Sequence, residues 1–334
     1  MRPQARKKRT ESFPVAAAER TRVPVRTKDF LSVLDLTHEE VERVLDLAAE
    51  MKEDRAAGRP GLRSLEGRHV ALLFEKPSLR TRTTFTVAIR ELGGEVIEPP
   101  AEVAFGGRES VEDVARNLER WLEGVVVRTF AQDRLERFAQ AAPRLHVINA
   151  LTDQEHPCQA LADMLTLREH VGTLAGRTLT FVGDGNNVAV SLAQAGALLG
   201  VNVRIASPKG YELPKAAADA ARAVARHGAT IEVTRDVRAA VTGADAVYTD
   251  VWASMGQEEE ADKRARIFAP YQVNDALMTA AGPGALFMHC LPAHRGLEVT
   301  DGVMDSDASV VFDQAENRLH TQKALLEFLV VGKK

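Results

Sequence analysis

Short apolar segments alternate with longer segments of mixed polarity along most of this chain. The segment 69–74 is typical, because five consecutive apolar residues follow His69 and Pro77 comes soon after. Continuous apolar runs of this length are typical of strands buried on both faces of a parallel sheet. On this criterion we predict strands at 69–74, 94–97, 124–128, 145–149, 177–183, 201–206, 229–234, 245–249, 285–288 and 309–312.

The segments between these strands have the spacing of amphipathic helices. The first helix is opened by Thr37-His-Glu-Glu40, which has the pattern of a capping box, and runs to about Gly58. Another, at 110–121, is opened by Ser110, with Asp113 three residues later. Further helices are predicted at 80–92, 131–141, 157–171, 187–199, 214–227, 274–280 and 315–331.

This order of elements predicts an α/β protein with two domains. Apolar strands that alternate with amphipathic helices indicate parallel sheets covered on both faces. The helix 157–171 ends near Gly172 and separates two such series. We therefore predict two doubly wound parallel-sheet domains joined by interdomain helices. In such sheets ligands bind beyond the carboxyl ends of the strands.

Composition narrows the class of protein. A length of 334 residues fits two domains of ordinary size. The net charge of −4, with no basic stripe in the predicted domains, argues against a nucleic-acid partner. No apolar run is long enough to span a bilayer, so we expect no membrane partner. The only cysteines, Cys158 and Cys290, argue for a reducing compartment over a disulfide scaffold.

Residues 1–28 differ from the rest of the chain. They are basic and contain only two acidic residues, Glu11 and Glu19. They lack the apolar core of a secretory signal. An organelle transit peptide and a disordered bacterial leader both fit. The scarcity of serine and the Ala/Arg/Val-rich chain favour the leader, and with it a cytoplasmic protein.

The motif Ser78-Leu-Arg-Thr-Arg82 follows the strand 69–74 and starts a predicted helix. Hydroxyls, guanidinium groups and free N–H groups at a helix N-terminus together suit an anion, and phosphate best. An ordinary helix cap with two solvated arginines is the alternative.

The motif His156-Pro-Cys-Gln159 follows the strand 145–149. Pro157 fits the first position of a helix, which places His156 and Gln159 on one face of its first turn. An imidazole and an amide there could bind a carbonyl oxygen and an NH₂ group. A pair of capping residues is the alternative.

The turn Gly183-Asp-Gly-Asn-Asn187 only partly matches a dinucleotide fingerprint. Val188 occupies the third glycine position, and no acidic residue closes the following strand. Two asparagines at a helix start suit a small polar ligand better. A tight turn with an asparagine cap is the alternative.

Two more motifs follow strands in the second half of the chain. Asp250, in Asp250-Val-Trp-Ala-Ser-Met-Gly256, follows the strand 245–249 and could hold an ammonium group; the Ser-Met-Gly part is typical of a loop that closes over a ligand. Cys290, in His289-Cys-Leu-Pro292, could be a nucleophile, a metal ligand or a substrate contact. His289 would point to the opposite face, and few other soft ligands are near. We therefore interpret Cys290 as a binding or positioning group and predict no metal.

Four of these motifs begin at Ser78, His156, Asp250 and His289. Together and in this order they resemble the motifs of an ornithine carbamoyltransferase, and the resemblance extends over about residues 29–331. The resemblance implies transfer of the carbamoyl group from carbamoyl phosphate to the side-chain amine of L-ornithine, without a cofactor. It implies a carbamoyl-phosphate domain (29–156, with the last helix 315–331 packed back on it), a linking helix (157–172) and an ornithine domain (173–314). It also implies homotrimers or assemblies of trimers, with active sites at subunit interfaces.

The resemblance also implies roles for individual residues. Those that bind carbamoyl phosphate would be Ser78, Leu79 through its backbone, Arg80, Thr81, Arg128, His156, Gln159, Cys290, Leu291 and Arg318. Those that bind ornithine would be Asn187, Asp250, Ser254 and Met255. The catalytic groups among them would be Arg80, Thr81, Arg128, His156, Asp250 and Cys290.

Two positions depart from the family pattern. Leu79 stands where many members have threonine, which a backbone contact tolerates. Ala104 stands where many members have a glutamine that reaches a neighbouring subunit's carbamoyl phosphate, and Arg108 is a possible substitute.

Three other functions are alternatives: a carbamoyltransferase for a related amine (N-acetylornithine or putrescine), a nicotinamide dehydrogenase, and an inactive regulatory homologue.

Overall fold

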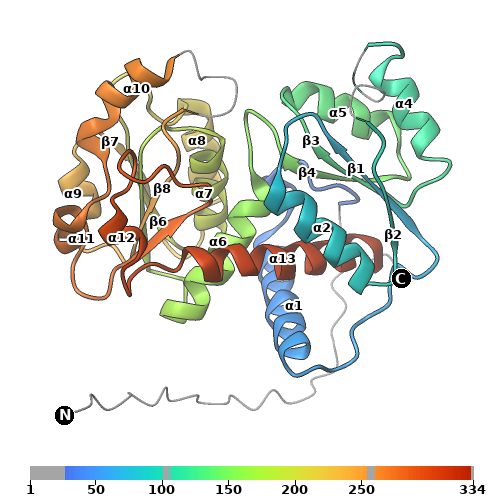
Figure 1. Cartoon of the computed structure of the whole chain (residues 1–334), viewed down its shortest axis with the longest axis horizontal. Helices are drawn as coiled ribbons and strands as arrows, with labels where there is room; N and C mark the ends of the chain where they lie inside the picture. The colour runs from blue at the N-terminus through green and yellow to red at the C-terminus, as the bar shows by residue number, and fades with distance from the viewer. Residues whose placement is uncertain (1–26, 101–104, 106, 254–259, 332–334) are drawn as a thin grey trace.

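The computed structural model describes residues 27–100, 105, 107–253 and 260–331 (Figure 1). The first half of the chain forms a parallel sheet of four strands in the order β2-β1-β3-β4. These strands are β1 (His69–Phe74), β2 (Glu95–Ile97), β3 (Gly124–Arg128) and β4 (His146–Leu151). The helices of this unit are α1 (His38–Ala56), α2 (Leu79–Glu91), α4 (Val111–Leu118) and α5 (Gln132–Ala141), after a short 3₁₀ turn, η1 (Val33–Asp35).

The second half forms a parallel sheet of five strands in the order β7-β6-β5-β8-β9. Its strands are β5 (Thr178–Val182), β6 (Asn202–Ala206), β7 (Ile231–Thr234), β8 (Ala246–Thr249) and β9 (Leu286–His289). Its helices are α7 (Asn187–Leu198), α8 (Lys215–Ala223), α9 (Val237–Val241), α10 (Ala261–Phe268), α11 (Asp275–Ala281) and α12 (Asp301–Met304), with a 3₁₀ turn, η3 (Ala269–Tyr271).

Alternate residues of the strands pack on opposite faces of each sheet, so both faces of each sheet are covered by helices. In the first unit, Leu72 and Val126 join the core with α1, α2 and α6, whereas Leu73 and Val125 join a separate core with α4 and α5. Each face of a buried parallel sheet must bury its apolar side chains. The predicted α/β class with two parallel-sheet domains is confirmed.

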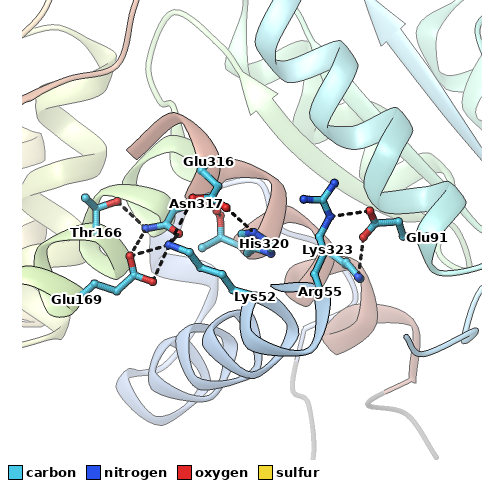
Figure 2. Close-up of polar contacts among 10 residues, drawn as sticks. Lys52, Arg55, Glu91, Thr166, Glu169, Glu316, Asn317, His320 and Lys323 are labelled. Atoms are coloured by element: carbon cyan, nitrogen blue, oxygen red, sulfur yellow. Dashed lines mark hydrogen bonds and ion pairs between the residues drawn. The ribbon is translucent and has the colours of Figure 1, made fainter. Parts of the chain in front are cut away.

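Two helices connect the units: α6 (Pro157–Val171) and α13 (Val311–Val331), which cross between them in Figure 1. The last helix, α13, packs against α1 and α2 of the first unit and against α6, as expected. Polar contacts fix this packing (Figure 2). Lys52 of α1 donates to Asn317 of α13 at 2.8 Å, and Glu91 of α2 accepts from Lys323 of α13 at 2.8 Å.

The helix starts agree with the cap signals in the sequence. Thr37 accepts from the Glu40 N–H, and the Glu40 side chain accepts from the Thr37 N–H, which is the predicted capping box. The Ser110 side chain accepts from the Asp113 N–H. Such caps satisfy N–H groups that have no partner inside the helix.

The predicted strand at 309–312 is wrong, and the last helix starts earlier than predicted. Ser309 makes only an isolated bridge to Phe287, and α13 already begins at Val311. The β-branched pair Val310-Val311 suggested a strand. Burial of Val310 and Val311 in two different cores at the start of α13 overrides this weak local preference. Among the described residues, no helix has both the length and the apolar character needed to cross a membrane.

Candidate active site

A cleft of about 790 Å³ lies where the carboxyl ends of strands from both sheets meet. The parallel direction of the strands explains this, because it brings the loops that follow them to one edge. Predicted site residues that line the cleft are Ser78, Leu79, Arg80, Thr81, Arg128, His156, Asn187, Asp250, Cys290, Leu291 and Arg318.

The first turn of α2 forms one wall of the cleft. Ser78 is its N-cap and accepts from the Thr81 N–H at 3.2 Å. The Thr81 hydroxyl accepts from the Arg318 guanidinium of α13. Ser78 therefore caps the helix, as the simpler alternative proposed. Capping alone does not explain why an arginine from the far end of the chain converges on the same turn.

Three arginines crowd this wall. Burial, with Arg318 and Arg80 next, lowers the pKa of Arg128 to about 10. Burial and Arg80 also lower the pKa of Arg318. The Nε atoms of Arg128 and Arg318 are buried without a hydrogen-bond partner in the described structure. Like charges held together with unpaired donors favour a multiply charged anion, whose binding would relieve their repulsion.

His156 lies beside these arginines at the start of α6. Its side chain makes no capping hydrogen bond, so the capping-pair alternative does not describe it. The His156 N–H donates to the Ser191 hydroxyl at 2.9 Å. Burial, followed by Arg318, Arg128 and Arg80, holds the pKa of His156 well below its ordinary value. The imidazole is therefore neutral at pH 7, and its Nδ1 has no partner in the described structure.

Gln159 lies one turn further along α6 and is 1% exposed. It does not itself line the cleft. Its Nε2 donates to Asp163 at 2.8 Å, and its Oε1 is buried without a partner among the described residues. The amide therefore retains one unused acceptor.

Asn186 and Asn187 start α7 on the opposite wall. Asn186 is the cap: its side chain accepts from the Val188 and Ala189 N–H groups, while its Nδ2 donates to Asp250 at 2.9 Å. Asn187 lines the cleft and donates to the Thr152 carbonyl of the first unit at 2.6 Å.

The structure also explains the glycine-rich turn without a nucleotide. A Cβ at Gly185 would lie 2.3 Å from the Leu213 backbone N, so this position requires glycine for packing. The dinucleotide interpretation therefore loses its main support.

Asp250 and Cys290 face each other on the floor of the cleft. The Cys290 thiol donates to Asp250 Oδ1 at 3.0 Å. Burial, with Asp250 next, raises the pKa of Cys290 well above its ordinary value. A protonated thiol is a poor nucleophile. His289 is fully buried and engages Glu298 and the Leu291 N–H, so it does not act as a base for Cys290.

The donor atoms of Asp250, His289 and Cys290 lie within 4.8 Å of one another, the only such group of possible metal ligands in the described part of the chain. Both ring nitrogens of His289 are already hydrogen-bonded. The thiol is protonated and bonded to the carboxylate. A metal would have to displace all of these bonds, so we assign none.

The sequence did not single out some residues that line or support the cleft. Lys76 lines it, pairs with Asp153 at 2.5 Å and lies 4.3 Å from the centre of the Phe130 ring. Its position directly before Pro77 was the one available signal. Arg264 of α10 binds Asp184 on the other wall, a contact that no motif indicates. Ser254 and Met255 lie outside the described residues, and so does Ala104.

Two neighbouring α/β units with a cationic wall opposite a buried carboxylate define a site for an anion and an amine. Profiles of two domain families match the chain: "Aspartate/ornithine carbamoyltransferase, carbamoyl-P binding domain" over residues 28–169 and "Aspartate/ornithine carbamoyltransferase, Asp/Orn binding domain" over residues 175–329. The chain therefore belongs to the aspartate/ornithine carbamoyltransferase family.

Relatives and solved structures within this family are similar over nearly the whole chain. The ornithine carbamoyltransferase of Parafrankia sp. is 52% identical over 305 residues, covering 91% of this chain and 96% of that protein. That of Parasynechococcus marenigrum is 53% identical over 311 residues, covering 92% and 96%. The solved Pyrococcus furiosus ornithine carbamoyltransferase is 46% identical with a TM-score of 0.89, covering 93% of this chain and 100% of that one.

Proposed function

We propose that this protein transfers the carbamoyl group of carbamoyl phosphate to the side-chain amine of L-ornithine, giving L-citrulline and phosphate. The observation that carries the proposal is the convergence of Arg80, Arg128 and Arg318 on one wall of a cleft whose floor holds Asp250. The arginine wall can bind an anion and Asp250 can bind an amine, so one cleft holds both sites.

Carbamoyl phosphate is assigned to the cationic wall. The N–H groups and dipole of α2 suit its phosphate, together with the charge of Arg80. The neutral imidazole of His156 and the guanidinium of Arg128 suit its carbonyl oxygen. We assign carbamoyl phosphate to Ser78, Leu79 through its backbone, Arg80, Thr81, Arg128, His156, Gln159, Cys290, Leu291 and Arg318.

Ornithine is assigned to the opposite wall and the floor. Asp250 is 7% exposed and lines the cleft, so it can pair with an ammonium group that enters there. The partners proposed from the sequence are Asn187, Ser254 and Met255. The contact of Asn187 with the Thr152 carbonyl would have to change if its amide is to bind the amino acid.

The reaction forms a C–N bond and breaks the C–O bond to phosphate. The lone pair of the neutral amine attacks the carbonyl carbon, and the bonding electrons leave with the phosphate. Arg80 and the start of α2 stabilise the charge that grows on the leaving group. Arg128, His156 and Thr81 polarise the carbonyl. An alkylamine has a pKa of about 10.4, so it must first lose a proton.

The role of Asp250 follows from this requirement. A carboxylate stabilises the ammonium form, which cannot attack, so Asp250 serves binding and orientation. The nitrogen loses two protons, one from the ammonium form before attack and one after the C–N bond forms, and these pass to solvent and to the departing phosphate. Cys290 keeps its own proton and orients Asp250. Positioning and electrostatics supply most of the rate.

We further propose the domain and assembly assignments that accompany this function. Residues 29–156 and the last helix, 315–331, form the carbamoyl-phosphate domain, residues 157–172 the link, and 173–314 the ornithine domain. The two profile matches, over 28–169 and 175–329, support one domain in each half of the chain, and the packing of α13 on α1 and α2 supports grouping the last helix with the first domain. The protein would act in the cytoplasm as a trimer or an assembly of trimers. Arg108, which is exposed, would replace the family's glutamine at position 104 as the cross-subunit contact.

A comparison of amines tests the choice of substrate. The purified protein is assayed with carbamoyl phosphate and, separately, L-ornithine, N-acetylornithine and putrescine. We expect kcat/KM to be highest for ornithine by at least about a hundredfold, since an unpaired charged group in the cleft costs about 3 kcal/mol. A higher value for either other amine would reassign the substrate, and no turnover with any of them would reject the function.

A further inference from the structure

Asp163 is a fully buried carboxyl group that the mechanism above does not use. It lies on α6, four residues after Gln159, so the two side chains share one face of the helix. Its Oδ1 accepts from Gln159 Nε2 at 2.8 Å and from Gln314 Nε2 of α13 at 2.6 Å. One oxygen atom thus receives two amide groups from two helices.

This contact determines which way the Gln159 amide faces. The carboxyl Oδ1 can only accept here, so the NH₂ group of Gln159 must point to it. The Gln159 Oε1 is then the atom left buried without a partner in the described structure. Burial raises the pKa of Asp163 to about 7. Among the described residues its Oδ2 has no hydrogen-bond partner, so a proton there leaves both bonds to Oδ1 intact.

Asp163 is itself held from the second unit. Gln314 Oε1 accepts from the His289 N–H at 3.0 Å, and its Nε2 lies 3.1 Å from the Tyr248 hydroxyl. The Gln314 amide is therefore also fixed in one orientation. Because Cys290 directly follows His289, the same contacts lead from Gln159 to the strand end at the floor of the cleft.

We propose that Asp163 is a positioning residue that fixes the Gln159 amide with its oxygen available to the NH₂ group of carbamoyl phosphate, and so selects against acyl phosphates that lack this group. The proposal rests on the proposed function. Acetyl phosphate has a methyl group in place of NH₂ and cannot donate. Its binding would leave the Gln159 oxygen unpaired and desolvated, which is costly.

The test compares the affinities of carbamoyl phosphate and acetyl phosphate for the full chain, by calorimetry and by inhibition. We expect the wild type to prefer carbamoyl phosphate by at least about tenfold, the worth of one buried hydrogen bond. In Asp163→Ala this preference should fall to about one- to twofold, mainly through weaker carbamoyl phosphate binding. Asp163→Asn, which keeps an acceptor at Oδ1, should retain it.

Two further variants show whether the effect passes through Gln159. Adding Asp163→Ala to Gln159→Ala should not change the preference further, because the amide is already gone. Thr166→Val breaks a buried bond from Asn317 between the same two helices (Figure 2) and should keep the wild-type preference. If Asp163→Ala does not fold, Asp163→Leu, which fills the space, takes its place.

The two hypotheses can fail separately. A wild type that binds neither phosphate would reject the proposed function. A wild type with a clear preference that Asp163→Ala or Asp163→Leu preserves would overturn only the role of Asp163. Loss of preference in Asp163→Asn, or an equal loss in Thr166→Val, would also overturn it, because the orientation of the amide would not be the cause.

Discussion

The Cys290 thiol donates a hydrogen bond to Asp250 Oδ1 across 3.0 Å. Each group follows a strand of the second sheet, Asp250 after β8 and Cys290 after β9, and these two strands are paired. The bond orients the carboxylate on the floor of the cleft and keeps the proton on sulfur. Cysteine therefore serves here as a hydrogen-bond donor.

A first prediction concerns this thiol. Iodoacetamide should modify Cys290 at pH 7.5 at least about tenfold more slowly than free cysteine, because the raised pKa leaves little thiolate. The rate should rise at alkaline pH, measured by mass spectrometry on Cys158→Ser protein. Cys290→Ser keeps a donor and should retain kcat within about tenfold. Rapid modification at pH 7.5, or complete inactivity of a folded serine variant, would instead indicate a nucleophile.

A second prediction separates the two arginines of the α2 motif. Arg80 lines the cleft, so Arg80→Ala should lower kcat/KM for carbamoyl phosphate by at least about a hundredfold while folding persists. Arg82 is not among the residues that line the cleft, and it pairs with Glu98 at 3.2 Å, with half of its side chain exposed. Arg82→Ala is the matched control and should stay within about threefold, since exposed ion pairs contribute little. Equal effects of both changes would remove the phosphate assignment.

A third prediction concerns acid stability. His320 of α13 is 1% exposed and lies among Lys52, Arg55 and Lys323, with Glu91 and Glu316 as the nearby acids (Figure 2). Burial and then these three cations lower its pKa to about 4. The folded state therefore resists protonation more than the unfolded state does. Its contribution to stability is complete above pH 6.5 and is lost as the pH falls from 6.5 toward 4.

Replacing this histidine should flatten that part of the curve. The free energy of unfolding, measured with urea between pH 7 and 4.5, should fall less steeply for His320→Leu than for the wild type. Parallel curves for wild type and His320→Leu would show that His320 is not the group that titrates.

Much of the fold could be predicted because the sequence of a buried parallel strand is a continuous run of apolar residues. The strand at 124–128 was placed at its observed residues for this reason. The same rule failed at 309–312, where Val310 and Val311 are both buried but α13 already begins at Val311. The sequence pattern does not predict the short helices α9, α10 and α12; α9 and α12, with five and four residues, are too short to show a helical period.

The site residues could be predicted where they directly follow a strand. Ser78, His156, Asp250 and Cys290 lie on four different loops, and the parallel topology brings them to one cleft. Residues that only orient a site residue, without lining the cleft, do not have to follow a strand and could not be predicted in this way. Asp163 lies in the middle of α6, and only its contacts with Gln159 and Gln314 reveal a role.

The central claim is the transfer of a carbamoyl group from phosphate to ornithine. The most direct measurement follows both products of the purified protein when it is given carbamoyl phosphate labelled in its carbonyl carbon and L-ornithine. We expect labelled citrulline and inorganic phosphate to appear at equal rates, and both rates to fall together in Arg80→Ala. Release of phosphate without citrulline, or no release above the uncatalysed rate, would contradict the account.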